Sequence, residues 1–316
     1  MEDNKIFVDE PYKSLVLGSG INLKALFSIL WSSKILILSI SSFFAIFSVI
    51  YTLSLSNIYT SSALLKLSQN DENSALSSIG SNFSGLASLA GVSIPTGGND
   101  QSEYAMKTLM SREFVKHISS FDDISINLIA ADGYDDQKKV ITIDPAIYDQ
   151  EKNIWVRSPT KYTQVIPTYL EIHKKYVKSV VVNKDKISGF ITISFQHYSP
   201  IFAKDFIDLI IQELNNIARE RNLIESKEAL QYLEEELEKV NQKDIRDSIN
   251  KLIATQLQTQ MFSNIKNDYL LETIDAPFIP EMKSAPSRAL LCIAITFFGM
   301  LISVMTVLIR YNFKNS

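Results

Sequence analysis

Two long apolar runs, residues 35–55 and 289–309, interrupt the mixed hydrophobic and polar pattern of the rest of the chain. Neither run contains a charged residue, and each has about the 20 residues that an α-helix needs to cross a bilayer. A cleaved signal peptide is disfavoured for the first run. Its apolar core is too long, 34 residues precede it and no small-residue cleavage site follows. The pattern therefore predicts two transmembrane helices.

These two runs divide the chain into an N-terminal segment, 1–34, a long loop, 56–288, and a tail, 310–316. Near the two spans, basic residues are slightly more frequent in the N-terminal segment and the C-terminal tail than at the two ends of the loop. The residues compared are Lys24, Lys34, Arg310 and Lys314 on the terminal side and Lys66, Lys283 and Arg288 in the loop. This asymmetry favours cytoplasmic termini. The opposite orientation stays open, because a long loop is translocated largely regardless of its charge.

Within the loop, the hydrophobic pattern predicts an α+β layer. The predicted strands are 57–67, 177–182, 187–195 and 269–274, with a turn at 183–186, and the predicted helices are 102–118 and 168–176. We expect one mixed sheet with helix 102–118 over one face. The Ser- and Gly-rich segment 71–98 lacks phosphate-loop spacing, and its apolar residues favour close packing. Residues 121–165 give mixed signals and no element is predicted there.

The stretch 199–264 predicts a long helical arm. Ser199 and Pro200 suit the N-cap and first helical positions, and no Gly or Pro occurs from there to residue 264. The apolar stripe includes Leu230, Leu233 and Leu237 and skips at 241–244, where a bend or short loop is expected. A helix this long needs a neighbour to cover its stripe, either its own later segment or another copy of the chain.

Small residues and prolines mark the expected contact positions of the two spans and their flanks. Ser41 and Ala45 are four apart in the first span, and Gly299 and Ser303 are four apart in the second. Such pairs let transmembrane helices approach closely. Pro277, Pro280 and Pro286 predict an extended segment at 276–287 that sets the geometry before the second span. Residues 22–34 predict an interfacial helix with Asn22 as N-cap and Trp31 as anchor.

Composition and motifs favour a protein without catalytic chemistry. The net charge is −4, and the acidic loop lacks the electrostatic footprint of a nucleic-acid-binding protein. Cys292, the single cysteine, lies in the second span, so the loop can form no internal disulfide. His117, His173 and His197 are isolated and lack metal-ligand spacing. We predict no catalytic, metal-binding or cofactor-binding residue and no cofactor.

Four segments, in their order, resemble the Wzz chain-length determinants, the polysaccharide co-polymerases of bacterial inner membranes. The first is LKALFSILWSSKILI at 23–37, followed by NIYTSSALL at 57–65. The second is GLASLAG at 85–91 with SREF at 111–114. The third is the long charged helix after a β-hairpin, and the fourth is APFIP at 276–280 with APSRAL at 285–290. The resemblance covers nearly the whole chain.

This resemblance implies an α+β membrane protein with two transmembrane helices and a periplasmic domain between cytoplasmic termini. Its α/β base would comprise about 56–198 and 265–276, near the membrane, and its helical arm 199–264. The implied protein is a homo-oligomer that sets the chain length of O-antigen or a related glycan and is not an enzyme. Its implied partners are a Wzy-type polymerase, undecaprenyl-linked glycan and membrane lipid, with no nucleic acid. One departure from the family is that the second span has a single glycine, Gly299.

A second interpretation belongs to a different class. The chain could be a membrane adaptor for capsule or exopolysaccharide export, working with a separate tyrosine kinase. Larger relatives of the Wzz family carry a fused kinase, whereas this sequence has no Walker motif and only Tyr311 after the second span. The short tail is therefore expected to disfavour kinase docking.

Overall fold

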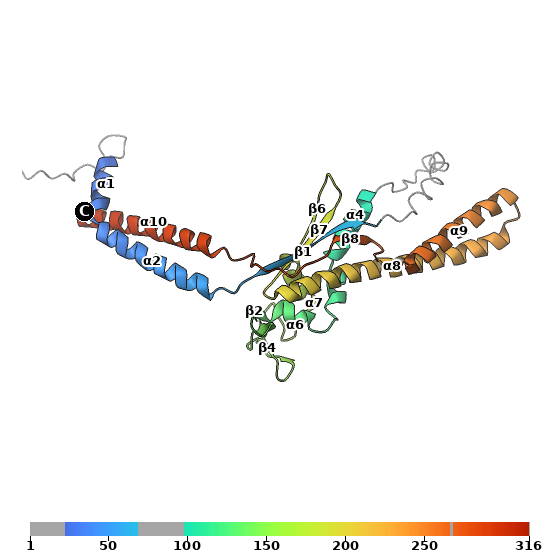
Figure 1. Ribbon diagram of the computed structural model, residues 1–316, viewed down its shortest axis with the longest axis horizontal. Coiled ribbons are helices and arrows are strands. Elements are labelled where there is room, and N and C mark those ends of the chain that lie inside the picture. The colour runs from blue at the N-terminus through green and yellow to red at the C-terminus, as the bar shows by residue number, and fades with distance from the viewer. Residues whose placement is uncertain (1–22, 69–97, 266–267, 316) are drawn as a thin grey trace, which may run out of the picture. The chain divides into compact units, whose positions relative to one another are not determined.

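The computed structural model describes residues 23–68, 98–265 and 268–315, which form two compact units. Of the described residues, one unit comprises 23–56 and 285–315, and the other comprises those between 57 and 284. Figure 1 labels most of their helices and strands. The expected close packing of segment 71–98 and the Asn22 cap lie outside the described residues.

The first unit contains α1 (Leu23–Ser32), α2 (Lys34–Ser54) and α10 (Arg288–Asn315). α2 and α10 pack along one another, and both are long and apolar enough to cross a membrane, with mean hydropathies of 2.2 and 2.5. Only 11% and 17% of these spans are buried within the chain, unlike the core helices of a globular domain. Their exposed apolar surface therefore needs an apolar environment such as lipid.

The second unit is built on a four-stranded sheet with the order β6-β7-β1-β8. Its strands are β6 (Val180–Lys184), β7 (Ile191–His197), β1 (Tyr59–Leu67) and β8 (Leu271–Asp275). All neighbouring pairs are antiparallel, so the expectation of a mixed sheet is wrong. The error arises because residue patterns identify strands, whereas strand direction depends on the connections between them.

One face of the sheet is buried by helices. Alternate residues of β1 and β7 are buried, which is the period expected of a sheet with one face on the core. α8 (Pro200–Lys239) packs across both strands, with Phe206 against Phe195 at a ring-centroid distance of 4.4 Å. α4 (Gly98–Leu109), α5 (Arg112–Ile118) and α7 (Tyr169–Ser179) contribute residues to the same core.

Several of the predicted elements have other boundaries in the structure. The turn expected at 183–186 begins only after Lys184, and the strand expected from residue 187 begins at Ile191. The helix expected over 102–118 is divided into α4 and α5, because Ser111 has an extended backbone and its hydroxyl accepts a hydrogen bond from Phe114 N at 3.1 Å. Ser111 is therefore an N-cap inside the predicted helix. α7 continues to Ser179, beyond its predicted end, and places Tyr176 in the core, so β6 starts three residues later than expected.

The region that gave mixed signals contains α6 (Ile124–Ile129) and two small β-hairpins. The hairpins pair β2 (Ala131–Asp135) with β3 (Val140–Ile143) and β4 (Tyr148–Asp149) with β5 (Ile154–Trp155). A separate small core forms around Ala130, Ile143 and Tyr148. The strands are too short for a period of two to emerge from the sequence.

The predicted long helix has the expected start and break. Ser199 is the N-cap of α8, accepting from Phe202 N at 3.2 Å, with Pro200 in the first turn. α8 ends at Lys239, and α9 (Lys243–Ile265) then lies beside it as the second arm of a helical hairpin (Figure 1). The buried side chain of Asn215 in α8 forms hydrogen bonds with the main chain of Leu270 and Leu271. These bonds connect α8 to the start of β8.

Candidate functional site

α2 and α10 approach one another closely at Gly299. A Cβ atom added to Gly299 would lie 2.5 Å from Phe44 Cγ, so this position tolerates only a hydrogen side chain at the observed spacing. Gly299 and Ser303 are buried, whereas Ser41 and Ala45 are half-buried. The four predicted residues thus lie on two packed helices, with Phe44 as the neighbour of Gly299.

Two further small polar residues lie in this contact and were missed from the sequence. Ser48 and Thr52 of α2 are buried, with 1% and 2% of their surfaces exposed. Thr52 Oγ1 lies 3.2 Å from Cys292 Sγ, which places the single cysteine at the helix contact. The sequence contains a pattern that could have identified them: Ser48 and Thr52 follow Ser41 and Ala45 in steps of three and four, which places all four on one face of a helix.

The proline-containing segment after β8 runs beside β1 without forming a helix. Pro277 and Pro280 are buried, and the hydrogen bonds around them involve serine side chains and other main-chain groups. Ser61 Oγ donates to Phe278 O at 2.7 Å, and Ser284 N donates to Ile58 O at 2.8 Å. Pro286 belongs to the other unit and is half-buried.

In the helical hairpin, the predicted leucine stripe is partly covered by the chain's own α9. Leu230 is 9% exposed, Leu233 and Leu237 are half-buried, and Ser226 Oγ donates to Gln256 O of α9 at 2.9 Å. The apolar side chains that stay exposed on the hairpin are Ile224, Tyr232, Ile245, Leu252, Leu257, Met261 and Ile265. These seven residues, here called the outer hairpin surface, are available for contacts with another molecule.

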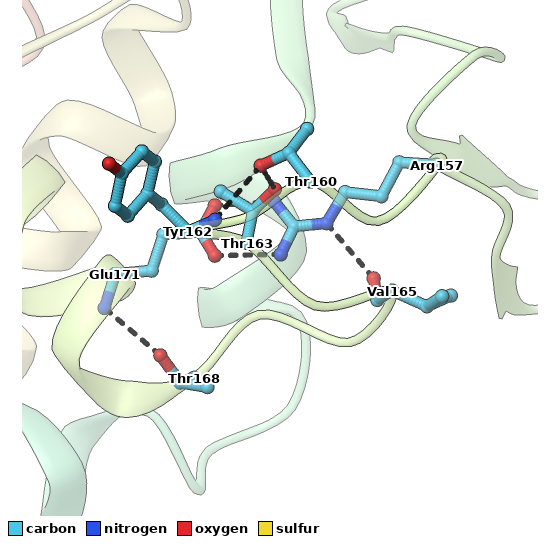
Figure 2. A network of polar contacts seen from close by, with 7 residues as sticks. All are labelled: Arg157, Thr160, Tyr162, Thr163, Val165, Thr168 and Glu171. Carbon is cyan, nitrogen blue, oxygen red and sulfur yellow. Dashed lines mark hydrogen bonds and ion pairs between the residues drawn. The ribbon is translucent and has the colours of Figure 1, made fainter.

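A bidentate ion pair between Arg157 and Glu171 connects the irregular segment 156–168 to α7. Arg157 binds both carboxylate oxygens of Glu171, one of them from Nη2 at 2.7 Å, and its Nε donates to Val165 O at 3.0 Å (Figure 2). The hydrogen bond to Glu171 raises the pKa of Arg157 above its ordinary value. Thr168 caps α7 by accepting from Glu171 N. The planar guanidinium suits this arrangement, because lysine cannot form the parallel pair.

All three histidines have structural partners. His117 Nε2 lies 2.6 Å from Glu213 Oε2, and His173 Nε2 lies 3.0 Å from Met110 O. His197 Nε2 donates to Asn127 O at 2.9 Å, and its Nδ1 accepts from Ser199 N at 3.1 Å. Burial lowers the pKa of His197 to about 4, so this neutral tautomer fits its surroundings. Among the described residues, no three His, Cys, Asp or Glu side chains are grouped to hold a metal ion.

Among the comparisons with known proteins, a family-model match supports the resemblance. Residues 19–120 match the family model Wzz, described as chain length determinant protein. A solved structure, "full-length bacterial polysaccharide co-polymerase", is 14% identical, with 93% of this chain and 99% of that chain covered and a TM-score of 0.37. A fragment of WzzB, a polysaccharide co-polymerase from Salmonella Typhimurium, is 13% identical, with 72% and 100% covered and a TM-score of 0.26. No curated protein sequence matches this chain. The family-model match alone confirms the Wzz resemblance, over residues 19–120.

Proposed function

We propose that this chain regulates the length of a surface polysaccharide, O-antigen or a related glycan, as a non-catalytic scaffold in the bacterial inner membrane. The single observation that carries the proposal is the match of residues 19–120 to the chain-length determinant family. This match includes α1, α2, β1, α4 and α5. The two apolar helices fit an inner-membrane protein with two spans.

The proposed topology has both termini in the cytoplasm and residues 56–288 in the periplasm. The basic residues Lys24, Lys34 and Arg310 beside the spans support this orientation. The predicted spans, 35–55 and 289–309, fall within α2 and α10 apart from Leu55. In this arrangement the sheet and the helical hairpin act outside the cytoplasm on undecaprenyl-linked glycan, together with a Wzy-type polymerase.

The proposed scaffold is a homo-oligomer in which the outer hairpin surface contacts other copies of the chain. Isolated apolar residues are common on protein surfaces, but seven on one helical hairpin form a candidate interface. In this scheme Leu230, Leu233 and Leu237 support the contact by joining α8 to α9. Chain length would depend on the shape of the assembly and on its contact with the polymerase.

Deleting the gene and resolving the surface polysaccharide on a gel tests the proposal. We expect a cluster of long chains to be replaced by a ladder of short ones, and complementation to restore the cluster. An unchanged ladder with loss of total capsule would reject chain-length control and support the export adaptor that works with a separate tyrosine kinase.

The proline segment offers a sharper test of mechanism. A stably produced variant with Pro277, Pro280 and Pro286 all replaced by Ala is expected to shorten or scatter the chain lengths, because the extended segment would lose its fixed φ angles. Pro159→Ala, in the segment held by Arg157, is the matched control. A distribution identical to that of the unmodified protein would contradict the geometric role of the three prolines.

A further inference from the structure

A polar groove lies where α6, the two small hairpins and the start of α8 meet, and no predicted function accounts for it. Its volume is about 440 Å³, which falls within the range of about 300–1,000 Å³ that is typical of small-ligand pockets. The groove is open to solvent, and all of its lining residues belong to the 57–284 unit. Figure 1 shows α6, β2 and β4 gathered near the first turns of α8.

Three lining residues have an unusual backbone conformation. Asp123, Lys139 and Asn153 have φ values of 63°, 56° and 54°, and they are the non-glycine residues with positive φ in the described part of the chain. They come from three different segments: the start of α6, the β2–β3 turn and the β4–β5 turn. Positive φ is ordinary for turn residues, above all Asn and Asp, so its role here is to shape the three turns that border the groove.

The groove offers hydrogen-bonding groups that have no partner among the described residues, three of them on exposed side chains (Asp123, Gln150 and Asn153). Four polar side chains in the lining make no hydrogen bond to any described residue: those of Asp123, Asn127, Gln150 and Asn153. Amide groups both donate and accept hydrogen bonds, whereas carboxylates only accept them. The groove thus offers a ligand both hydrogen-bond donors and hydrogen-bond acceptors.

Apolar side chains lie between these polar groups. Phe202, Ile126 and Val140 line the groove together with Tyr148, which is 8% exposed. A ligand that suits this surface carries many hydroxyl groups and also has apolar C–H faces. The carboxylates of Asp123 and Asp205 outnumber the single basic lining residue, Lys139, and disfavour an acidic peptide. Among the described residues, no three His, Cys, Asp or Glu side chains are grouped to hold a metal ion.

We infer that this groove binds a short segment of an oligosaccharide, with Asn127 and Asn153 hydrogen-bonding its hydroxyl groups. The class of ligand rests on the proposed function, whereas the position of the site rests on the geometry of the groove. Binding of glycan here would give the chain a direct contact with the polymer whose length it regulates.

The chain contains a natural reporter of binding. Trp155 lies edge-on to Tyr148 with ring centroids 5.1 Å apart, and Tyr148 lines the groove. The other tryptophan is Trp31 in α1, so Trp31→Phe leaves Trp155 as the source of indole fluorescence. The full chain is purified in a detergent without a sugar headgroup. It is titrated with oligosaccharides released by mild acid from the lipid-linked glycan of the cells that produce it.

Two variants remove amides while preserving the fold. Asn153→Gly retains a residue that adopts positive φ readily, and Asn127→Ala introduces a better helix former into α6. Lys186→Gly, an exposed residue in the turn between β6 and β7, is the control. We expect a saturable change of Trp155 emission, with a dissociation constant at least tenfold higher in both groove variants and unchanged in the control.

The same affinity in all variants, or no saturable change with any glycan, would overturn the inference. These outcomes are separable from a failure of the proposed function. If gene deletion collapses the long chains and no binding is measured, the groove assignment fails by itself. If binding depends on Asn127 and Asn153 but deletion leaves the chain lengths unchanged, the site stands and the regulatory role fails.

Discussion

Replacing Asn215 by Leu should remove the hydrogen bonds between α8 and the start of β8 and so destabilise the 57–284 unit. Asn215 is 3% exposed. Its Oδ1 accepts from Leu270 N and Leu271 N, both at 2.8 Å, and its Nδ2 donates to Leu271 O at 3.0 Å. Leucine has the same number and branching of side-chain heavy atoms as asparagine but can make none of these bonds.

The expected loss in the free energy of unfolding follows from the main-chain groups that lose their hydrogen-bond partner. Leu271 is 1% exposed, so water cannot replace the lost bonds to its N–H and C=O. Each buried polar group left without a partner costs about 1–3 kcal/mol. With a smaller contribution from half-buried Leu270, we expect a loss of about 3–5 kcal/mol. In a domain of this size 1 kcal/mol shifts Tm by about 2–4 °C, so Tm should fall by about 10 °C.

Thermal unfolding of the full chain in detergent, followed by near-ultraviolet circular dichroism, measures this effect. Asn216→Leu is the matched control. Asn216 is the next residue on the same helix, and its side chain bonds only Glu213 and Arg219 among the described residues. The control should lose less than about 1 kcal/mol, as is typical for exchanges near the surface. If Asn215→Leu unfolds at the same temperature as this control, the bond between α8 and β8 does not stabilise the domain as argued.

Three further perturbations test other parts of the chain. The pKa of His197 is about 4 in the fold and 6.5 ordinarily, so the unfolded state is protonated first as pH falls. The free energy of unfolding should therefore drop by about 3 kcal/mol between pH 6.5 and pH 4, and an equal drop in His197→Gln would contradict this origin. Arg157→Ala should speed tryptic cleavage after Lys161, because the segment loses its ion pair with Glu171, whereas Lys138→Ala should not. Thr52→Cys should form a disulfide with Cys292, given the 3.2 Å contact. After proteolysis, a non-reducing gel should show the two spans joined, but not in Tyr51→Cys or once Gly299→Leu is added. Undiminished cross-linking in the Gly299→Leu variant would show that the close approach to Phe44 does not set the helix spacing.

Local patterns in the sequence were sufficient for the two spans, the start and break of the long helix and several strands. The two apolar runs became α2 and α10, because a helix that crosses lipid needs a continuous apolar stretch. Ser199 and Pro200 marked the start of α8, since capping involves residues within one turn. The skip at 241–244 located the break between α8 and α9, which falls at 240–242.

Contacts between distant residues were decided only by the tertiary structure. The sequence left open whether the leucine stripe would be covered by its own chain, and α9 buries Leu230 by folding back on α8. No pattern could reveal that Phe44 lies against Gly299 or that Asn215 bonds β8, because each pair is far apart in sequence. The same reason applies to the groove. Turn residues such as Asp123 and Asn153 are ordinary one at a time, and only the packing of α6 and the two hairpins against α8 makes them neighbours. The sequence thus determined the membrane-spanning segments, the long helical arm with its break, and several strands, through short-range periodicity and capping. Strand direction and site composition required the long-range packing of the folded chain.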